Sequence, residues 1–157
     1  GTQPSTSADL SKLERQGVML LNSVLTVASS KPGSHSQLGW QLVTDCVLDA
    51  VARDPNPTVF LLWGAEAQRK SELLQADHNL VLSAPHPSPL SAYRGFFQCG
   101  HLAAANDFLT TRGRGGYAAA EAATAYLDRE PTTAEQYGAL SHMVFKKPAI
   151  PHQIVIL

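Results

Sequence analysis

The stretch TVFLLWG, residues 58–64, decides the fold class of this 157-residue chain. It holds an unbroken apolar run from Val59 to Trp63, and valine, phenylalanine and tryptophan all favour strands. A short apolar run of this kind is typical of a strand buried on both faces of a parallel sheet. The segment after Gly64, AEAQRKSELLQ (residues 65–75), is rich in helix-forming residues. This part of the chain therefore predicts a strand followed by a helix.

The same alternation of strands and helices extends along the chain on both sides of this stretch. The runs VMLLN (residues 18–22) and NLVLS (residues 79–83) predict two more strands. Helices are predicted over residues 38–54, where apolar side chains recur at helical spacing, and over residues 101–113. We therefore predict an α/β fold, a three-layer sandwich around a central, mostly parallel sheet of four strands.

The chain divides into three predicted parts. Residues 1–8 form a flexible tail, residues 9–113 form the α/β core, and residues 114–157 hold an Ala-rich helical segment and a last strand. This strand, HQIVIL (residues 152–157), is all apolar over its final residues and needs neighbours on both of its edges. We expect it to complete the sheet by filling a gap between the first two strands. An extension unrelated to the sheet is the alternative.

Composition and charge exclude several classes of protein. The 12 lysines and arginines face 13 aspartates and glutamates, so no overall basic field points to a polyanionic partner. Cys46 and Cys99 are too few for a disulfide framework and favour a reducing, intracellular setting. Since no apolar run reaches the roughly 20 residues that span a bilayer, we expect a soluble chain with no membrane partner. We expect no metal and no other cofactor.

Three unusual segments follow predicted strands at their carboxyl ends. Asn22 ends the first strand, Gly64 opens the turn after the second, and His86 opens the loop after the third. Ligands of open α/β sheets bind outside the carboxyl ends of the strands. We therefore expect these three segments to share one site.

Four motifs, in this order, resemble a known family. They are GVMLLNSVLTV (residues 17–27), GWQLVTDCV (39–47), VFLLWGAEAQ (59–68) and HPSPLSAYRGFFQCGH (86–101). Together they resemble the second half of family 1 uracil-DNA glycosylases over residues 10–113. The resemblance implies hydrolytic excision of uracil from DNA by base flipping, as in base-excision repair. It implies uracil-containing DNA as the partner, in a DNA-containing compartment of the cell such as the nucleus or mitochondrion.

The resemblance assigns the chemistry to two residues. His86 is implied to be the catalytic hydrogen-bond donor, as a neutral imidazole, to the uracil oxygen on which negative charge develops when the glycosidic bond breaks. Asn22 is implied to bind uracil by pairing with its Watson–Crick edge and to reject cytosine by mismatching the exocyclic amine.

The resemblance assigns DNA contacts to the loop that follows His86. Leu90 is implied to enter the base stack as a wedge, on a loop that two prolines stiffen. Ser88 and Ser91 are implied to hydrogen-bond the flanking phosphates, and Arg94 to add a charge contact. Ala65 occupies a DNA-binding position at which the family often has serine, so one phosphate contact is absent there.

One part of the family pattern is not found in these 157 residues. Family members carry a loop GQDPYH, whose aspartate positions the attacking water, followed by a phenylalanine that stacks on uracil. In the family an apolar strand precedes that loop, so the strand at 152–157 resembles a circularly permuted copy of it. Two interpretations follow: an enzyme whose water-activating half lies on a second chain or in a larger assembly, or an inactive glycosylase-like domain that serves as a structural or nucleic-acid-binding subunit. Retention of His86, Asn22 and Leu90 favours the enzyme.

Taken one by one, the same residues have plainer interpretations. A lone His86 is more often a loop residue bonded to a carbonyl, and a lone Asn22 a turn former. The side chains that we expect to pack or to make local contacts, rather than to bind DNA, are Phe96, Phe97, Trp40, Trp63 and His35.

Overall fold

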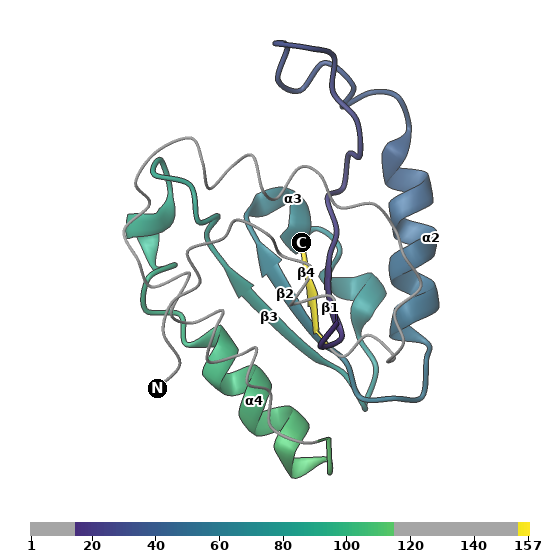
Figure 1. Cartoon of the computed structure of the whole chain (residues 1–157), viewed down its shortest axis with the longest axis vertical. Helices are drawn as coiled ribbons and strands as arrows, with labels where there is room; N and C mark the ends of the chain where they lie inside the picture. Colours follow the sequence, from purple (N-terminus) through teal and green to yellow (C-terminus); the bar gives the residue numbers. More distant parts are fainter. Residues whose placement is uncertain (1–14, 115–153) are drawn as a thin grey trace.

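The sheet of this protein has four parallel strands. A computed structural model describes residues 15–114 and 154–157. Within them the strands are β1 (Val18–Leu20), β2 (Val59–Trp63), β3 (Leu80–Ala84) and β4 (Ile154–Ile156). Their order across the sheet is β1-β4-β2-β3, and every neighbouring pair is parallel (Figure 1). The predicted four-stranded, mostly parallel sheet is confirmed.

The last strand along the chain, β4, lies inside the sheet between β1 and β2. Ile154 is in register with Val18 of β1 on one side and with Val59 of β2 on the other. All three residues of β4 are buried, which suits their wholly apolar sequence. The pairing continues past the end of the strand, because the Leu157 N–H donates to the Leu61 carbonyl over 2.9 Å. β4 therefore occupies the gap that the apolar C-terminal run is expected to fill.

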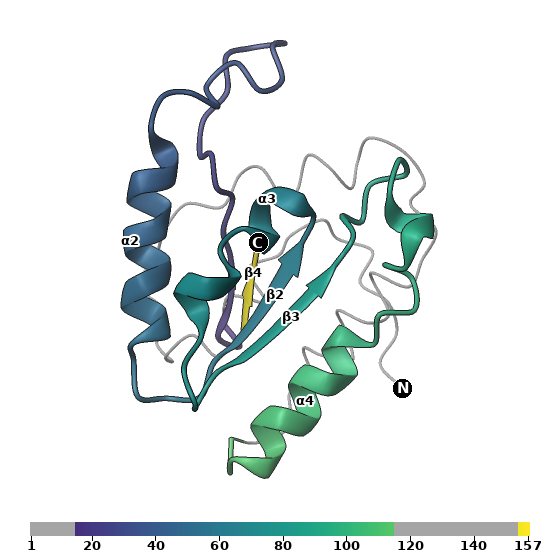
Figure 2. The same cartoon turned by 180° about the vertical axis from the view of Figure 1, so that it is seen from behind.

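Helices cover both faces of the sheet. The two views from opposite sides show α2 (Trp40–Ala52) on one face and α4 (His101–Thr111) on the other (Figures 1 and 2). Successive side chains of β2 point to opposite faces and so join two separate hydrophobic cores. The residues of β2 in the core under α4 are Val59, Leu61 and Trp63, and those in the core under α2 are Phe60 and Leu62. The three-layer arrangement is confirmed.

One predicted helix is two short turns instead. Residues 65–75 form α3 (Ala65–Gln68) and then the 3-10 helix η1 (Ser71–Leu74). Only Ala67 and Leu74 are buried in these two elements. Because most helical stability in proteins comes from packing of an apolar face, so little buried surface does not support a longer helix. The prediction of one continuous helix is wrong.

Part of the predicted organisation lies outside the described residues. This holds for the tail at 1–8 and for the Ala-rich helical segment within 115–153, so the division into three parts stays a prediction. In the part of the chain that is described, no helix has the length and apolar character needed to cross a membrane.

Candidate active site

The carboxyl ends of the strands meet at one edge of the sheet. At this edge the Trp63 N–H donates to the Leu157 carbonyl (3.0 Å), and the Gly64 N–H donates to the Ala84 carbonyl (2.9 Å). Asn22 lies at the same edge, two residues beyond the end of β1. The structure thus brings together the segments that follow β1, β2 and β3.

Gly64 and His86 are in close contact at this edge. Gly64 has a φ of +99°, a backbone conformation that residues with a side chain rarely adopt. A Cβ atom at this position would lie 3.1 Å from Cβ of His86 and 3.4 Å from its Cδ2. The absence of a side chain therefore lets the imidazole pack on the backbone of the turn. Sequence reasoning did not find this contact, and its only local signal is a glycine directly after a buried strand.

The imidazole of His86 is held in one tautomer. The backbone N–H of Ser88 donates to Nδ1 of His86 over 3.0 Å, so Nδ1 carries a lone pair and the proton sits on Nε2. Although His86 is exposed as a whole, desolvation of its ring by burial lowers the pKa of His86 below the ordinary value for histidine. Both effects favour a neutral ring at neutral pH, with the Nε2–H as its one hydrogen-bond donor.

The loop after His86 is braced by its own hydroxyl groups. The Ser91 hydroxyl donates to the His86 carbonyl over 2.8 Å and lies 3.1 Å from the Ser88 hydroxyl. The backbone N–H groups of Ser91 and Ala92 both donate to the Ser88 carbonyl. Ser88 and Ser91, which the resemblance assigns to phosphates, thus also hold the shape of the loop.

The tip of this loop presents an apolar side chain to solvent. Leu90 is 89% exposed, which makes it the most exposed large hydrophobic residue in the part of the chain that the structure describes. Arg94, at the end of the 3-10 helix η2 (Ala92–Arg94), is exposed and has no carboxylate partner among the described residues. Ala65 is exposed too, directly after the glycine that touches His86. The braced loop therefore holds the Leu90 side chain almost fully in solvent.

Aromatic side chains form the base of the loop. Phe96 and Trp63 are both buried, and their rings meet edge to face with centroids 5.0 Å apart. Phe97 is partly buried beside Phe96, and the centroid of its ring lies 5.6 Å from that of the Tyr93 ring. The expectation that Phe96 and Trp63 pack in the core is confirmed.

A second loop, between β1 and α2, is ordered by a small polar network. The Trp40 Nε1–H donates to the Thr26 hydroxyl over 2.7 Å, and the same hydroxyl lies 2.9 Å from Nδ1 of His35. The expected local contact of His35 is confirmed. Trp40 is half-buried at the first position of α2.

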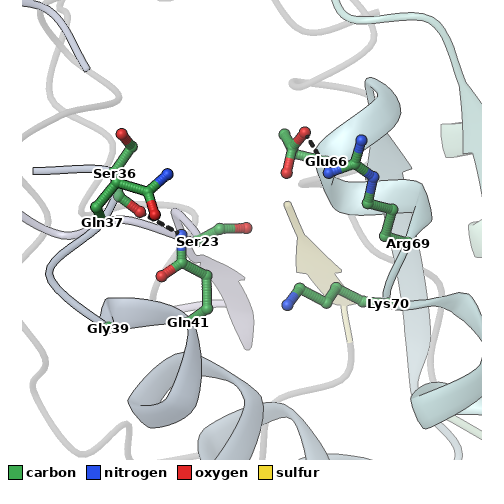
Figure 3. A pocket seen from close by; sticks show the side chains of 8 residues that line it. All are labelled: Ser23, Ser36, Gln37, Gly39, Gln41, Glu66, Arg69 and Lys70. Atoms are coloured by element: carbon green, nitrogen blue, oxygen red, sulfur yellow. Dashed lines mark hydrogen bonds and ion pairs between the residues drawn. The ribbon is translucent and has the colours of Figure 1, made fainter.

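A polar pocket of about 410 Å³ lies between this second loop and α3 (Figure 3). Its walls come from Ser23, Ser36, Gln37, Gly39, Gln41, Glu66, Arg69 and Lys70. Both cations are neutralised, since Arg69 pairs with Glu66 (2.8 Å) and Lys70 with Asp45 (2.7 Å). His86 does not line the pocket, whereas Ser23 is the neighbour of Asn22 along the chain. No local pattern in the sequence predicts this pocket, because its walls come from segments far apart in sequence.

The described residues hold no metal centre. No group of three or more histidine, cysteine, aspartate or glutamate residues gathers among them in a way that could bind a metal ion.

Comparison with known proteins relates most of the chain to one family. A family model described as the uracil DNA glycosylase superfamily matches residues 6–110. A protein of Chromobacterium violaceum named uracil-DNA glycosylase is 56% identical over 108 residues, which are 69% of this chain and 45% of that protein. Proteins of the same name from Ralstonia pickettii and Sinorhizobium medicae are 52% and 50% identical, over 69% and 72% of this chain and 41% and 47% of their own lengths. The chain spans less than half the length of these relatives.

Proposed function

This chain belongs to the uracil-DNA glycosylase superfamily, and on that premise we propose that it acts on uracil-containing DNA in hydrolytic uracil excision. Its residues recognise the base and stabilise the departing uracil. The proposal places the protein inside the cell, in a compartment that holds DNA.

The state of His86 is the observation that carries this proposal. When the glycosidic bond breaks, its electron pair passes to the uracil ring, and negative charge develops on a ring oxygen. A preorganised donor aimed at that oxygen lowers the barrier. The Ser88 N–H and the lowered pKa of His86 both support a neutral imidazole whose Nε2–H is that donor.

Selection of uracil is assigned to Asn22. Its amide has both an acceptor and two donors, so it can pair with N3–H and with the neighbouring carbonyl of uracil at once. Cytosine offers a lone pair and an amine at the same two positions, so an amide fixed in the orientation that pairs with uracil meets the wrong groups and rejects cytosine. The position of Asn22 at the edge that also holds His86 supports this role.

Base extrusion is assigned to the braced loop. A nucleotide that leaves the stack exposes a gap, and an apolar side chain that enters the gap compensates for lost stacking. The 89% exposure of Leu90 supports this role. The hydroxyl contacts of Ser88 and Ser91 support it as well, because an already ordered loop loses little entropy when it binds.

Activation of water is assigned to a group outside this sequence. The 157 residues contain no GQDPYH motif, and the proposal places the missing carboxylate on a second chain or in a larger assembly. Loss of a water-positioning carboxylate slows the chemical step but leaves base binding in place. The isolated chain is therefore expected to bind uracil-containing DNA and to release uracil slowly.

An excision assay with the isolated chain tests the proposed function. A labelled single-stranded oligonucleotide with one uracil is incubated with excess protein and then cleaved with alkali, and a matched oligonucleotide with thymine is the control. We expect tighter binding of the uracil strand and slow cleavage at the uracil position only. Binding without cleavage would favour the inactive, nucleic-acid-binding alternative. Equal binding of the two strands would contradict both.

The wedge role of Leu90 predicts a difference between two substrates. Leu90→Ala is expected to lower uracil release from duplex DNA by about 10-fold, equivalent to about 1.4 kcal/mol, because the gap in the stack is no longer filled. Release from single strands should change far less, since no paired stack has to be opened there. Single-turnover rates on matched duplex and single-stranded substrates measure both effects.

Leu42→Ala is the matched control for this variant. Leu42 is 75% exposed on α2, away from the loop that follows His86, so its loss should alter neither rate. An equal fall on both substrates in Leu90→Ala would argue against a wedge.

A further inference from the structure

A second histidine lies buried beneath the proposed site. His101 begins α4 and is only 7% exposed, so it cannot touch a DNA substrate directly. Its Nδ1 accepts a hydrogen bond from the Trp63 Nε1–H over 3.1 Å, inside the core. This ring is therefore a structural partner of β2 rather than a group on the surface.

Both nitrogens of the His101 ring are occupied. Since Nδ1 accepts from Trp63, the hydrogen bond between the ring and the Ser83 backbone uses the Nε2–H as donor and the Ser83 carbonyl as acceptor. Burial lowers the pKa of His101, and the bond to Ser83 opposes that effect. A neutral ring in this tautomer pairs with both the Trp63 N–H and the Ser83 carbonyl, so it joins α4, β2 and β3 at one point.

That point lies at the edge of the sheet where β2 and β3 end and the proposed site begins. Trp63 is the last residue of β2 and precedes Gly64, on which the His86 ring packs. The indole of Trp63 also meets Phe96 edge to face, at the base of the loop that carries Leu90. A rotation of the indole would therefore disturb both the floor under His86 and the support of the loop.

We propose that His101 and Trp63 form a positioning pair that holds the indole in one orientation and thereby sets the placement of His86. The inference rests on the proposed function for its catalytic meaning, because it deepens the account of the same site. Both residues are buried, so they act on the site through Gly64 and Phe96. Small displacements of a catalytic group have large effects on rate, so a buried pair of this kind can matter for catalysis at a distance.

Variants of His101 separate positioning from plain stability. His101→Leu removes both hydrogen bonds and leaves the indole N–H without a partner, whereas His101→Asn keeps an oxygen close to where Nδ1 lies. Leu109→Ala is the control, because Leu109 is fully buried in the same helix near its other end, far along the chain from the loop. Trp63→Phe, which keeps an aromatic ring against Phe96 but removes the donor, serves where His101→Leu does not fold.

Two readouts decide the proposal. Nitrogen chemical shifts of labelled histidine report the tautomer of His86, and single-turnover excision reports the chemical step. We expect His101→Leu to displace His86 from the Ser88 N–H that fixes its tautomer, so that both tautomers are populated, and to lower the excision rate by up to about 100-fold at unchanged substrate affinity. His101→Asn should restore most of the excision rate and most of the single His86 tautomer. Leu109→Ala should change neither the tautomer nor the rate of the chemical step.

The tautomer readout keeps this proposal separate from the proposed function. If the wild-type chain releases no uracil, the proposed function fails, yet the His86 shifts still show whether His101 positions that ring. The positioning role is overturned if His86 keeps its tautomer in both His101→Leu and Trp63→Phe. It is also overturned if Leu109→Ala changes His86 as much as those variants do.

Discussion

Replacement of His86 by alanine is expected to lower the single-turnover rate of uracil release by about 100- to 1000-fold, the usual effect of removing one donor that stabilises a developing anion. The affinity for a uracil-containing oligonucleotide should change little, because the hydrogen bond strengthens only as charge develops. The rate is measured with protein in excess over labelled DNA, so that it reports a single turnover even when release is slow.

The control and the pH dependence make this prediction specific. His78→Ala removes a histidine that precedes β3 at the opposite edge of the sheet, and it should leave the rate unchanged. The donor must be neutral, and burial lowers the pKa of His86, so the neutral form is the main one above the ordinary histidine value of about 6.5. The rate of uracil release should therefore stay constant as the pH is lowered to about 6.5 and should decrease only below that value. A rate unchanged in His86→Ala would remove the central observation from the proposed function.

Introduction of a charge into the middle of the sheet is expected to destabilise the fold strongly. Val155 of β4 is fully buried in the core that α2 covers, and strands flank it on both edges. Val155→Asp places a carboxylate there without a partner, which should lower the free energy of unfolding by more than about 3 kcal/mol. Because a domain of this kind is stable by only about 5–15 kcal/mol, this loss removes a large share of its stability.

Urea unfolding, followed by the fluorescence of Trp40 and the buried Trp63, measures this effect. Val43→Asp is the matched control, since Val43 is 53% exposed on α2 and the same change should shift the midpoint little. If Val155→Asp unfolds at the same urea concentration as the wild type, the C-terminal strand does not occupy the centre of the sheet. That outcome would favour an unrelated extension.

The elements of the fold could be predicted because their signals are local. An apolar run such as Val59–Trp63 identifies a buried strand by its own composition, and the helical spacing of apolar residues identifies α2 in the same way. The segment at 65–75 shows the limit of this reasoning. Helix-forming residues there predict one helix, but burial of only Ala67 and Leu74 leaves two short turns.

The sequence by itself determined the alternation of strands and helices, the edge at which Asn22, Gly64 and His86 emerge, and the four motifs of the family. Only the tertiary structure decided the state of the candidate site. The contact of Gly64 with His86 and the bond of Trp63 to His101 join residues 22 and 38 positions apart. No local pattern encodes such contacts, because they depend on how three layers pack against one another. The physical reason is that secondary structure follows from neighbours along the chain, whereas the placement of a buried or packed ring follows from neighbours in space.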